Sequence, residues 1–298
     1  MSRTSITVLA IVLALVSHAT LARAEAAPDR YRSPAYYAVH GGVTASLFAA
    51  GVLSRYARSL EAGPDFCFFP GDLSVRENYS HEAASASNVT LPLVVTVPVA
   101  AQFGLGVGKH SLNAALVYSE TLAANLALNS LSKVLFSRPR PSTYRLRAAG
   151  AMPDGDWYVS FYSGHSSTAF AAAVSGAYLF AEGTGDPEAR YLLWASEIGL
   201  AAASAMLRVR AGKHYYSDVV VGALVGAGIG IGVPLIHGAR YQPEVGEYVA
   251  GGAGLVLGTA ASALIPLASD PVTPASTAVD WSIQPSASGL GLEVSGTF

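Results

Sequence analysis

The sequence predicts an all-α fold, a bundle of about six helices that a membrane could embed. Two observations support this class. Hydrophobic residues make up 51% of the 298 residues and charged residues only 13%, and the mean hydropathy is +0.38. Long apolar stretches also recur along the chain. Because strands are usually 3–10 residues long, roughly, stretches of this length are expected to be helices.

The first 24 residues are typical of a secretory signal peptide. They contain Arg3, an apolar run over 6–16, and the cleavage pattern Ala22-Arg23-Ala24. Cleavage after Ala24 would remove two arginines and take the formal net charge from −2 to −4. Such a chain has no global basic field, so nucleic acid is not an expected partner. An uncleaved membrane anchor is the alternative interpretation of this segment.

Seven apolar stretches of helical length follow. They cover 36–55, 88–107, 112–136, 166–182, 190–207, 216–236 and 246–266. A lipid-facing span needs about 20 mostly apolar residues, and several of these stretches are too short or too polar for that. The 112–136 stretch carries Asn113, Glu120, Asn125 and Asn129. Such groups must face the interior of a bundle or water.

Residues 25–266 are therefore expected to form one helical domain, and 267–298 a C-terminal tail. Apolar residues alternate in two parts of the tail, at Val279, Trp281 and Ile283, and again at Leu290, Leu292 and Val294. The stretch PSASG lies between these parts, so a small β-hairpin is predicted. Cys67 is the only cysteine of the chain, which excludes an intramolecular disulfide.

A cluster of basic side chains lies in the stretch RVRAGKHYYSD, where Arg208, Arg210, Lys213 and His214 fall within seven residues. If a helix begins near His214, Asp218 lies one turn along the same face. Its carboxylate could accept a hydrogen bond from one imidazole nitrogen and leave the other as a nucleophile. The alternative is a helix start at which Asp218 only pairs with Lys213.

A second stretch, SFYSGHSST, places Ser163, Gly164 and His165 directly before an apolar stretch. Ser166 or Ser167 is the expected helix cap. Backbone N–H groups at a helix start attract anions, and Gly164 has no Cβ to keep an anion away. The pattern therefore favours a phosphate cradle, with an ordinary helix cap as the alternative.

A third stretch, KVLFSRPRPSTYRLR, follows the end of the 112–136 stretch. Pro139 and Pro141 prevent the helix from continuing, so Arg140 is held on an extended segment. If the chain turns back, Lys133 and Arg140 can meet one anion, and the guanidinium can bind it with two hydrogen bonds. The alternative is a basic loop that flanks a membrane span.

Together the three stretches resemble the signature of the type 2 phosphatidic acid phosphatase (PAP2) superfamily, which includes bacterial acid phosphatases and vanadium-dependent haloperoxidases. That signature reads K-x6-R-P, P-S-G-H and S-R-x5-H-x3-D. The chain matches it in order at Lys133, Arg140, Pro141, Ser163, Gly164, His165, Arg208, His214 and Asp218. It departs from the signature at Tyr162, where the family has proline, and at Leu207, where it has serine.

The resemblance implies a role for each matched position. His214 would attack phosphorus and form a phosphohistidine, with Asp218 orienting it. His165 would protonate the leaving alkoxide and then activate water. The non-bridging oxygens would be held by Lys133, Arg140 and Arg208, the Ser163 hydroxyl and the Gly164 N–H. This arrangement requires no metal or other cofactor.

The resemblance also implies a substrate class and a location. The expected partner is a phosphorylated lipid, such as a polyprenyl-type diphosphate, or a small phosphomonoester. The expected location is the cell envelope, with the site on the periplasmic side and the chain either bound to the inner membrane or soluble in the periplasm. If the stretches 36–55, 88–107 and 112–136 all crossed, however, Lys133 would lie in the cytoplasm. The first and third are the ones suspected of not crossing.

Three other interpretations of the function stay open: a broad-specificity soluble acid phosphatase, a vanadate-dependent haloperoxidase, and an inactive phospholipid-binding protein. Zinc at His165, His214 and Asp218 would be opposed by three neighbouring cations. The pair Asp154 and Asp156 indicates a solvated turn in preference to a calcium loop.

Two further groups of residues have no assigned chemistry. Arg145, Arg147, Trp157 and Tyr158 are interpreted equally as a substrate lip or as packing. The remaining histidines of the mature chain have no charged constellation nearby in the sequence and are expected to be structural or exposed: His40, His81, His110 and His237.

Overall fold

The computed structural model of the protein describes residues 33–57, 62–63, 65–106, 109–151, 156–264, 280–286 and 289–295. The predicted signal peptide at 1–24 lies outside these residues, and so do 267–279 of the predicted tail. The predicted division into a signal peptide, one helical domain and a tail therefore stays a prediction.

A helix covers most of each of the seven apolar stretches. The long helices are α2 (Pro34–Leu53), α3 (His81–Gly104), α4 (Lys109–Phe136), α6 (Gly164–Gly183), α7 (Pro187–Arg210), α8 (Tyr216–Ile236) and α9 (Val245–Ser262). A short helix α5 (Ser142–Ala148) and two 3-10 segments, η1 (Ser54–Ala57) and η2 (Pro70–Glu77), lie in the connections. The predicted all-α class is confirmed. The described residues form seven long helices where about six were expected, because every apolar stretch has enough apolar surface to pack as a helix.

In the C-terminal tail the backbone contains β1 (Asp280–Ser286) and β2 (Gly289–Ser295), which pair antiparallel with Ile283 opposite Leu292. An isolated two-stranded hairpin is marginally stable in water. That the two strands form a stable hairpin therefore stays a prediction.

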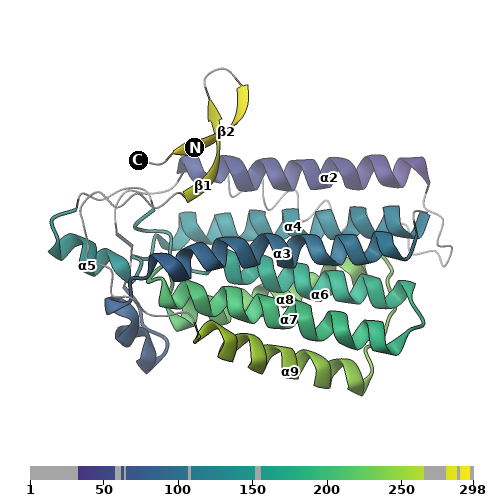
Figure 1. The fold of residues 1–298 in the computed structure, drawn as a ribbon. Coiled ribbons are helices and arrows are strands. Elements are labelled where there is room, and N and C mark those ends of the chain that lie inside the picture. The colour runs from purple at the N-terminus through teal and green to yellow at the C-terminus, as the bar shows by residue number, and fades with distance from the viewer. Residues whose placement is uncertain are drawn as a thin grey trace.

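The long helices lie side by side along one common direction, with α2 on one face of the bundle and α9 on the opposite face (Figure 1). Helix α2 packs on α4, α6 packs on α8, and α7 packs on α9, while α3 contacts both α6 and α7. Helix α6 is the central element, since all residues over 171–181 are buried. An apolar helix buried on all sides is typical of the core of a bundle.

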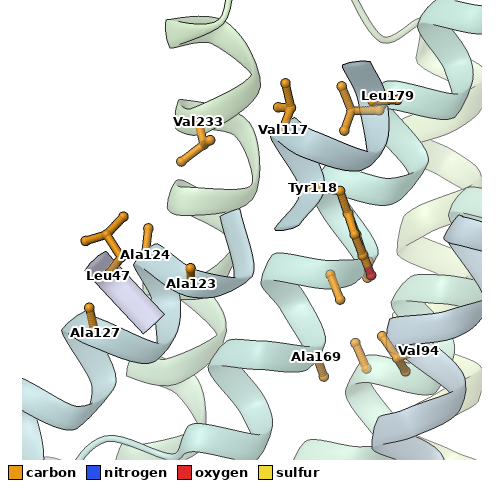
Figure 2. Close-up of a cluster of buried hydrophobic side chains, with 14 residues drawn as sticks. Leu47, Val94, Val117, Tyr118, Ala123, Ala124, Ala127, Ala169, Leu179 and Val233 are labelled. Carbon is orange, nitrogen blue, oxygen red and sulfur yellow. The ribbon is translucent and has the colours of Figure 1, made fainter. Parts of the chain in front are cut away.

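Small side chains allow the helices to pack closely. Figure 2 shows the main core, which includes the α4 alanines Ala123, Ala124 and Ala127. Four other helices contribute to the same core, with Leu47 from α2, Val94 from α3, Ala169 from α6 and Val233 from α8. Helices α6 and α8 approach each other closely, as do α7 and α9. A Cβ on Gly226 would lie 2.2 Å from the carbonyl oxygen of Ser167, and Gly222 and Gly230 face α6 in the same way. A side chain at these positions would separate the two helices.

Four of the described helices are long and apolar enough to cross a membrane: α2, α3, α7 and α8. Many large apolar side chains on these helices are exposed. On α8 they include Val220, Leu224, Ile231 and Leu235. Val220 and Leu224 are four residues apart, as are Ile231 and Leu235, so each pair lies on one face of the helix. Because a soluble monomer rarely exposes so much contiguous apolar surface, these helices suggest association with a membrane.

Candidate active site

The three signature stretches meet at one end of the bundle, the end at which α4 and α7 finish and α6 and α8 begin. Lys133 lies in the last turn of α4 and Arg208 in the last turn of α7. His165 lies in the first turn of α6, and His214 directly precedes α8. The structure therefore brings together residues that are up to 85 positions apart in the printed sequence, from Lys133 to Asp218.

The loop before α6 is held by the end of α4. The Nζ of Lys133 donates hydrogen bonds to the carbonyl oxygens of Ser160, at 3.1 Å, and of Tyr162. The amide of Asn129 donates a second hydrogen bond to Tyr162 O, at 2.9 Å. Tyr162, which stands where the family has proline, thus accepts two of these hydrogen bonds with its backbone carbonyl oxygen. Those from Lys133 fix its buried ammonium group against this loop.

His214 has one ring nitrogen occupied and the other available. Its Nδ1 donates to the carbonyl oxygen of Ser160 at 2.8 Å, which places the lone pair on Nε2. The predicted direct bond from His214 to Asp218 is not formed, since Nδ1 lies 3.7 Å from Asp218 Oδ2. The helix begins at Tyr216, so Asp218 turns its carboxylate back to the Tyr215 N–H, at 2.9 Å, and to Ser160 Oγ, at 2.5 Å.

Asp218 therefore acts on His214 indirectly, through Ser160. The Ser160 hydroxyl binds the carboxylate while the Ser160 carbonyl accepts the imidazole proton. Asp218 also receives Arg138 Nη1 at 2.6 Å. It is thus a positioning group that fixes the loop on which His214 depends.

His165 is held by α3. Its Nε2 lies 3.2 Å from Asn88 Oδ1, so the amide oxygen keeps a proton on this nitrogen. Asn88 belongs to a glycosylation-like triplet in an apolar stretch, and only the fold shows that it faces the site. No pattern in the sequence indicates this contact.

The surroundings favour the neutral form of both histidines. Burial lowers the pKa of His165 well below its ordinary value, and Arg208, His214, Arg140 and Lys133 lower it further. Burial also lowers the pKa of His214, with Lys133, Arg140 and Arg208 adding to the effect against a small opposite contribution from the Ser160 hydrogen bond. Nearby positive charge disfavours a second cation, so each imidazole keeps a lone pair.

We call Lys133, Arg140 and Arg208 the cation cluster. Arg208 Nη1 donates to Ser87 Oγ at 3.1 Å, which fixes its guanidinium against α3. Arg140 Nη2 donates to Asp156 Oδ1 at 2.7 Å, and its Nε and Nη1 are buried without a partner among the described residues. Two orphaned guanidinium N–H groups beside two neutral imidazoles make a binding site for an anion.

Ser163 caps α6, whereas Ser166 or Ser167 was the expected cap. Its Oγ accepts the N–H of Ser166 at 3.3 Å, and its own N–H donates to the carbonyl oxygen of Asp218 at 3.0 Å. The cap shifts by three positions because Ser163 has extended backbone angles and Gly164 is already helical. A Cβ on Gly164 would lie 2.9 Å from Asn129 Oδ1, so glycine also allows close packing there.

Arg138, Asp72 and Ser217 form with Asp218 a group that we call the carboxylate cluster. Arg138 Nη1 donates to Asp218 Oδ1 and to Ser217 Oγ, at 2.6 and 2.9 Å, and Nη2 donates to Asp72 Oδ2 at 3.2 Å. Asp72 in turn accepts the Ser217 N–H at 3.0 Å and its hydroxyl at 2.6 Å. All four side chains are buried.

The guanidinium of Arg138 is also enclosed by aromatic rings. It lies 4.5 Å from the ring centre of Phe66 and 3.9 Å from that of Tyr215, within the range of cation–π attraction. This cluster lies outside the matched positions of the signature, apart from Asp218. Arg138 stands next to the signature in RPRP, which is a signal that could have been used, whereas Asp72 lies in a segment with no motif.

The residues considered as a substrate lip are engaged in packing. Trp157 and Tyr158 are buried. Arg147 Nη2 donates to the Tyr158 hydroxyl at 2.6 Å, and Arg145 Nη1 donates to the carbonyl oxygen of Glu77 at 3.2 Å. Lys213, considered as a partner of Asp218, lies 3.7 Å from Asp156 instead.

Comparison with known proteins agrees with this arrangement. Residues 114–242 match the family model described as the PAP2 superfamily. The matched range includes all three signature stretches, from Lys133 to Asp218. Neither the comparison with curated proteins nor that with solved structures found a match.

Proposed function

Since this chain is a member of the PAP2 superfamily, whose enzymes are phosphatases or haloperoxidases, we propose that it is a phosphatase of the cell envelope that hydrolyses a lipid phosphate or diphosphate. The observation that carries the proposal is a pair of imidazoles next to the cation cluster, His214 buried and His165 half-buried, both with a lowered pKa. One imidazole has a fixed tautomer with a free lone pair, and the cations match the charge of a phosphate.

In the first step, Nε2 of His214 attacks phosphorus while the bond from phosphorus to the ester oxygen breaks. Ser160 holds the proton of Nδ1, so the lone pair is available at neutral pH. A bound phosphate dianion offsets the cation cluster, which raises the pKa of His165 from its depressed value and lets it carry a proton. His165 gives this proton to the leaving alkoxide, which departs as an alcohol.

In the second step, His165 takes a proton from water, and the resulting hydroxide attacks the phosphohistidine. The phosphorus–nitrogen bond then breaks, which returns the lone pair to Nε2 of His214 and releases phosphate. In both steps the non-bridging oxygens gather charge next to Arg140 and Arg208. Hydrogen bonds already directed at this position stabilise the transition state more than the substrate.

The reaction proceeds without a metal ion in this proposal. The histidines and Asp218 have the side chains of a zinc site, but Lys133, Arg140 and Arg208 act electrostatically on both imidazoles. A divalent cation placed there would meet three positive charges, whereas a phosphate would neutralise them.

The position of the site favours a lipid substrate. Arg208 lies in the last turn of α7, and Ser87 and Asn88 lie on α3. Both of these helices are long and apolar enough to cross a membrane. A site at the end of such helices lies at the level of lipid headgroups. A phosphate there can reach the cation cluster while its acyl or prenyl chain remains in the bilayer.

The direct test is phosphate release by the full-length protein in detergent, with a panel of lipid phosphates and small phosphomonoesters and with chelator present. Replacing His214 with alanine removes the nucleophile, so release is expected to fall by about 10⁴-fold or more. A matched control is His110→Ala, which removes an exposed imidazole from α4 and should leave the rate unchanged. Equal release by wild type and His214→Ala would contradict the proposal, and vanadate-dependent halide oxidation would then be measured.

Cys67 offers a way to determine on which side of the membrane the site lies. It is exposed and directly follows Phe66, whose carbonyl oxygen accepts a hydrogen bond from Arg138 at the active-site end. We propose that this end faces the periplasm. A membrane-impermeant maleimide should then label Cys67 in intact spheroplasts. Labelling only after lysis would place the site in the cytoplasm. That location is the one expected if the signal peptide is cleaved and α2, α3 and α4 all cross the membrane.

A further inference from the structure

A second buried group of chemically active side chains lies away from the active site. His40 of α2, Glu120 of α4 and His237, which directly follows α8, each direct one potential ligand atom to a common point, and these atoms lie within 4.8 Å of one another. Their exposed fractions are 3%, 0% and 5%. The sequence places no charged constellation near His40 or His237, but in the fold both lie buried beside the carboxylate of Glu120. Three helices bring them together, and no spacing along the chain shows this.

The distances fit a metal site better than a set of hydrogen bonds. Nδ1 of His40 lies 3.3 Å from Glu120 Oε2, and Nε2 of His237 lies 3.2 Å from the same oxygen. Hydrogen bonds between a charged N–H and a carboxylate are shorter, about 2.7–2.9 Å. With bonds of about 2.0–2.1 Å to a tetrahedral zinc ion, neighbouring ligand atoms are separated by about 3.3–3.4 Å.

The surroundings of His237 also fit a ligand. If Nε2 binds the metal, Nδ1 must carry the proton, and Nδ1 contacts the hydroxyl oxygen of Tyr36, itself 3% exposed. Histidines that bind metals almost always donate their second nitrogen to such a partner, which fixes the tautomer and the ring. The ring of Tyr36 also lies 4.3 Å from that of His40, measured between centres, so one residue supports both imidazoles.

The group is separate from the active site. His214 directly precedes α8 and His237 directly follows it, and a helix of 21 residues is about 32 Å long. Along α4, Glu120 lies 13 residues before Lys133, which corresponds to about 20 Å. Unlike the cation cluster, this group combines a carboxylate with two imidazoles, which is the donor set for a divalent cation.

We propose that His40, Glu120 and His237 bind a divalent first-row transition-metal ion, with zinc as the best fit, and that this ion joins α2 and α4 to the end of α8. Two neutral imidazoles and one carboxylate leave a net positive charge on the site and one open position for water. The ion places a positive charge next to the fully buried carboxylate of Glu120. Helix α2 lies at the face of the bundle, so a metal that also binds His237 gives it a second attachment besides its packing on α4 (Figure 1).

The test is zinc binding by the full-length protein in detergent after removal of metals with a chelator. Zinc is titrated against a chromophoric competitor, and cobalt(II) is added separately to record the absorption bands of a tetrahedral ion. We expect one zinc per chain. The nearly isosteric Glu120→Gln should weaken zinc binding by about 100-fold or more, and Tyr36→Phe, which removes only the hydroxyl partner of His237, by about 10-fold.

Two controls separate this site from other histidines. His110→Ala and His214→Ala should bind zinc as the wild type does, and circular dichroism checks that each variant keeps its helices. The proposal is overturned if the wild type binds no zinc, if Glu120→Gln binds it as tightly as the wild type, or if His214→Ala abolishes binding. Zinc binding by the wild type is measured without any variant. The proposal can therefore be overturned even if Glu120→Gln does not fold.

Discussion

Arg138 and Arg140 lie two residues apart in the same connection, yet their surroundings are opposite. Arg138 is fully buried and donates four hydrogen bonds, three of them to side chains of the carboxylate cluster. Arg140 has one carboxylate partner, the partly exposed Asp156, and two buried N–H groups without a partner among the described residues. Arg138 Nε is also buried without a partner among the described residues, but both of its Nη atoms are bound, whereas Arg140 leaves Nε and Nη1 without a partner there.

The comparison shows how one end of the bundle divides two tasks. Positive charge that is satisfied by the protein holds the loop of His214 in place through Asp218 and Ser160. In the proposed function, positive charge that the protein leaves unsatisfied attracts the phosphate. If this division is correct, removal of the two arginines must have different consequences, one for stability and the other for rate.

The largest expected effect is on stability, from Arg138→Met. It leaves Asp72 and Asp218 buried with no positive partner, which should lower the free energy of unfolding by about 3–5 kcal/mol. Chemical unfolding followed by circular dichroism measures this loss. Adding Asp72→Asn should recover part of it because one buried charge is then removed. If Arg138→Met is as stable as the wild type, the carboxylate cluster has no structural role.

The next effect is on rate, from Arg140→Ala. Loss of the orphaned N–H groups should lower kcat by about 10²–10³-fold, as for the removal of a donor to a transition state. The released Asp156 is 43% exposed and can be solvated, so the unfolding free energy should change by less than about 1 kcal/mol. Phosphate release and chemical unfolding are measured on the same preparation. A large loss of stability with an unchanged kcat would reverse the assignment of the two arginines.

Acid should weaken the fold through the two active-site histidines. Their pKa values are lowered in the folded chain, so below about pH 6.5 the unfolded chain binds more protons than the folded chain. The free energy of unfolding therefore decreases as the pH decreases. Each histidine contributes at most about 1.4 kcal/mol per pH unit, down to its folded pKa. Unfolding across this pH range should show a smaller slope for the double variant with His165→Asn and His214→Asn. An identical slope in both proteins would argue against neutral, buried imidazoles.

The smallest effect is expected from Asn88→Ala. It removes the acceptor that keeps the proton on Nε2 of His165, so kcat should fall by about 10-fold while KM changes little. The pH profile of kcat separates this from a packing defect, because only the loss of a partner of His165 shifts the alkaline limb, on which this general acid loses its proton. An unchanged profile would show that Asn88 does not position the acid.

The sequence predicted the helices well because their signal is local. Each apolar stretch is long and contains its own helix, and the polar 112–136 stretch places Asn125 and Asn129 toward neighbouring elements, as expected. The signature also identified side chains that meet at one end of the bundle. Spacing alone could not determine their hydrogen bonds: a start of α8 at Tyr216, and not at His214, is enough to direct Asp218 to Ser160.

What the sequence did not predict comes from segments that are distant in the chain. Asp72 binds Ser217 across 145 positions, and Asn88 reaches His165 across 77. His40 and Glu120 are separated by 80 positions and each lies in an ordinary apolar stretch. Such contacts depend on which helix faces are adjacent, and a single sequence does not contain that information.

The glycines of α8 have a consequence for the distance between acid and nucleophile. His165 begins α6 and His214 precedes α8, so the gap between the two imidazoles depends on how closely these helices approach at Gly222, Gly226 and Gly230. The backbone atoms in contact there act as a fixed spacer, and its thickness is set by van der Waals radii. The spacing of the two imidazoles is thus determined inside the bundle, beginning at Gly222 beside Ser163.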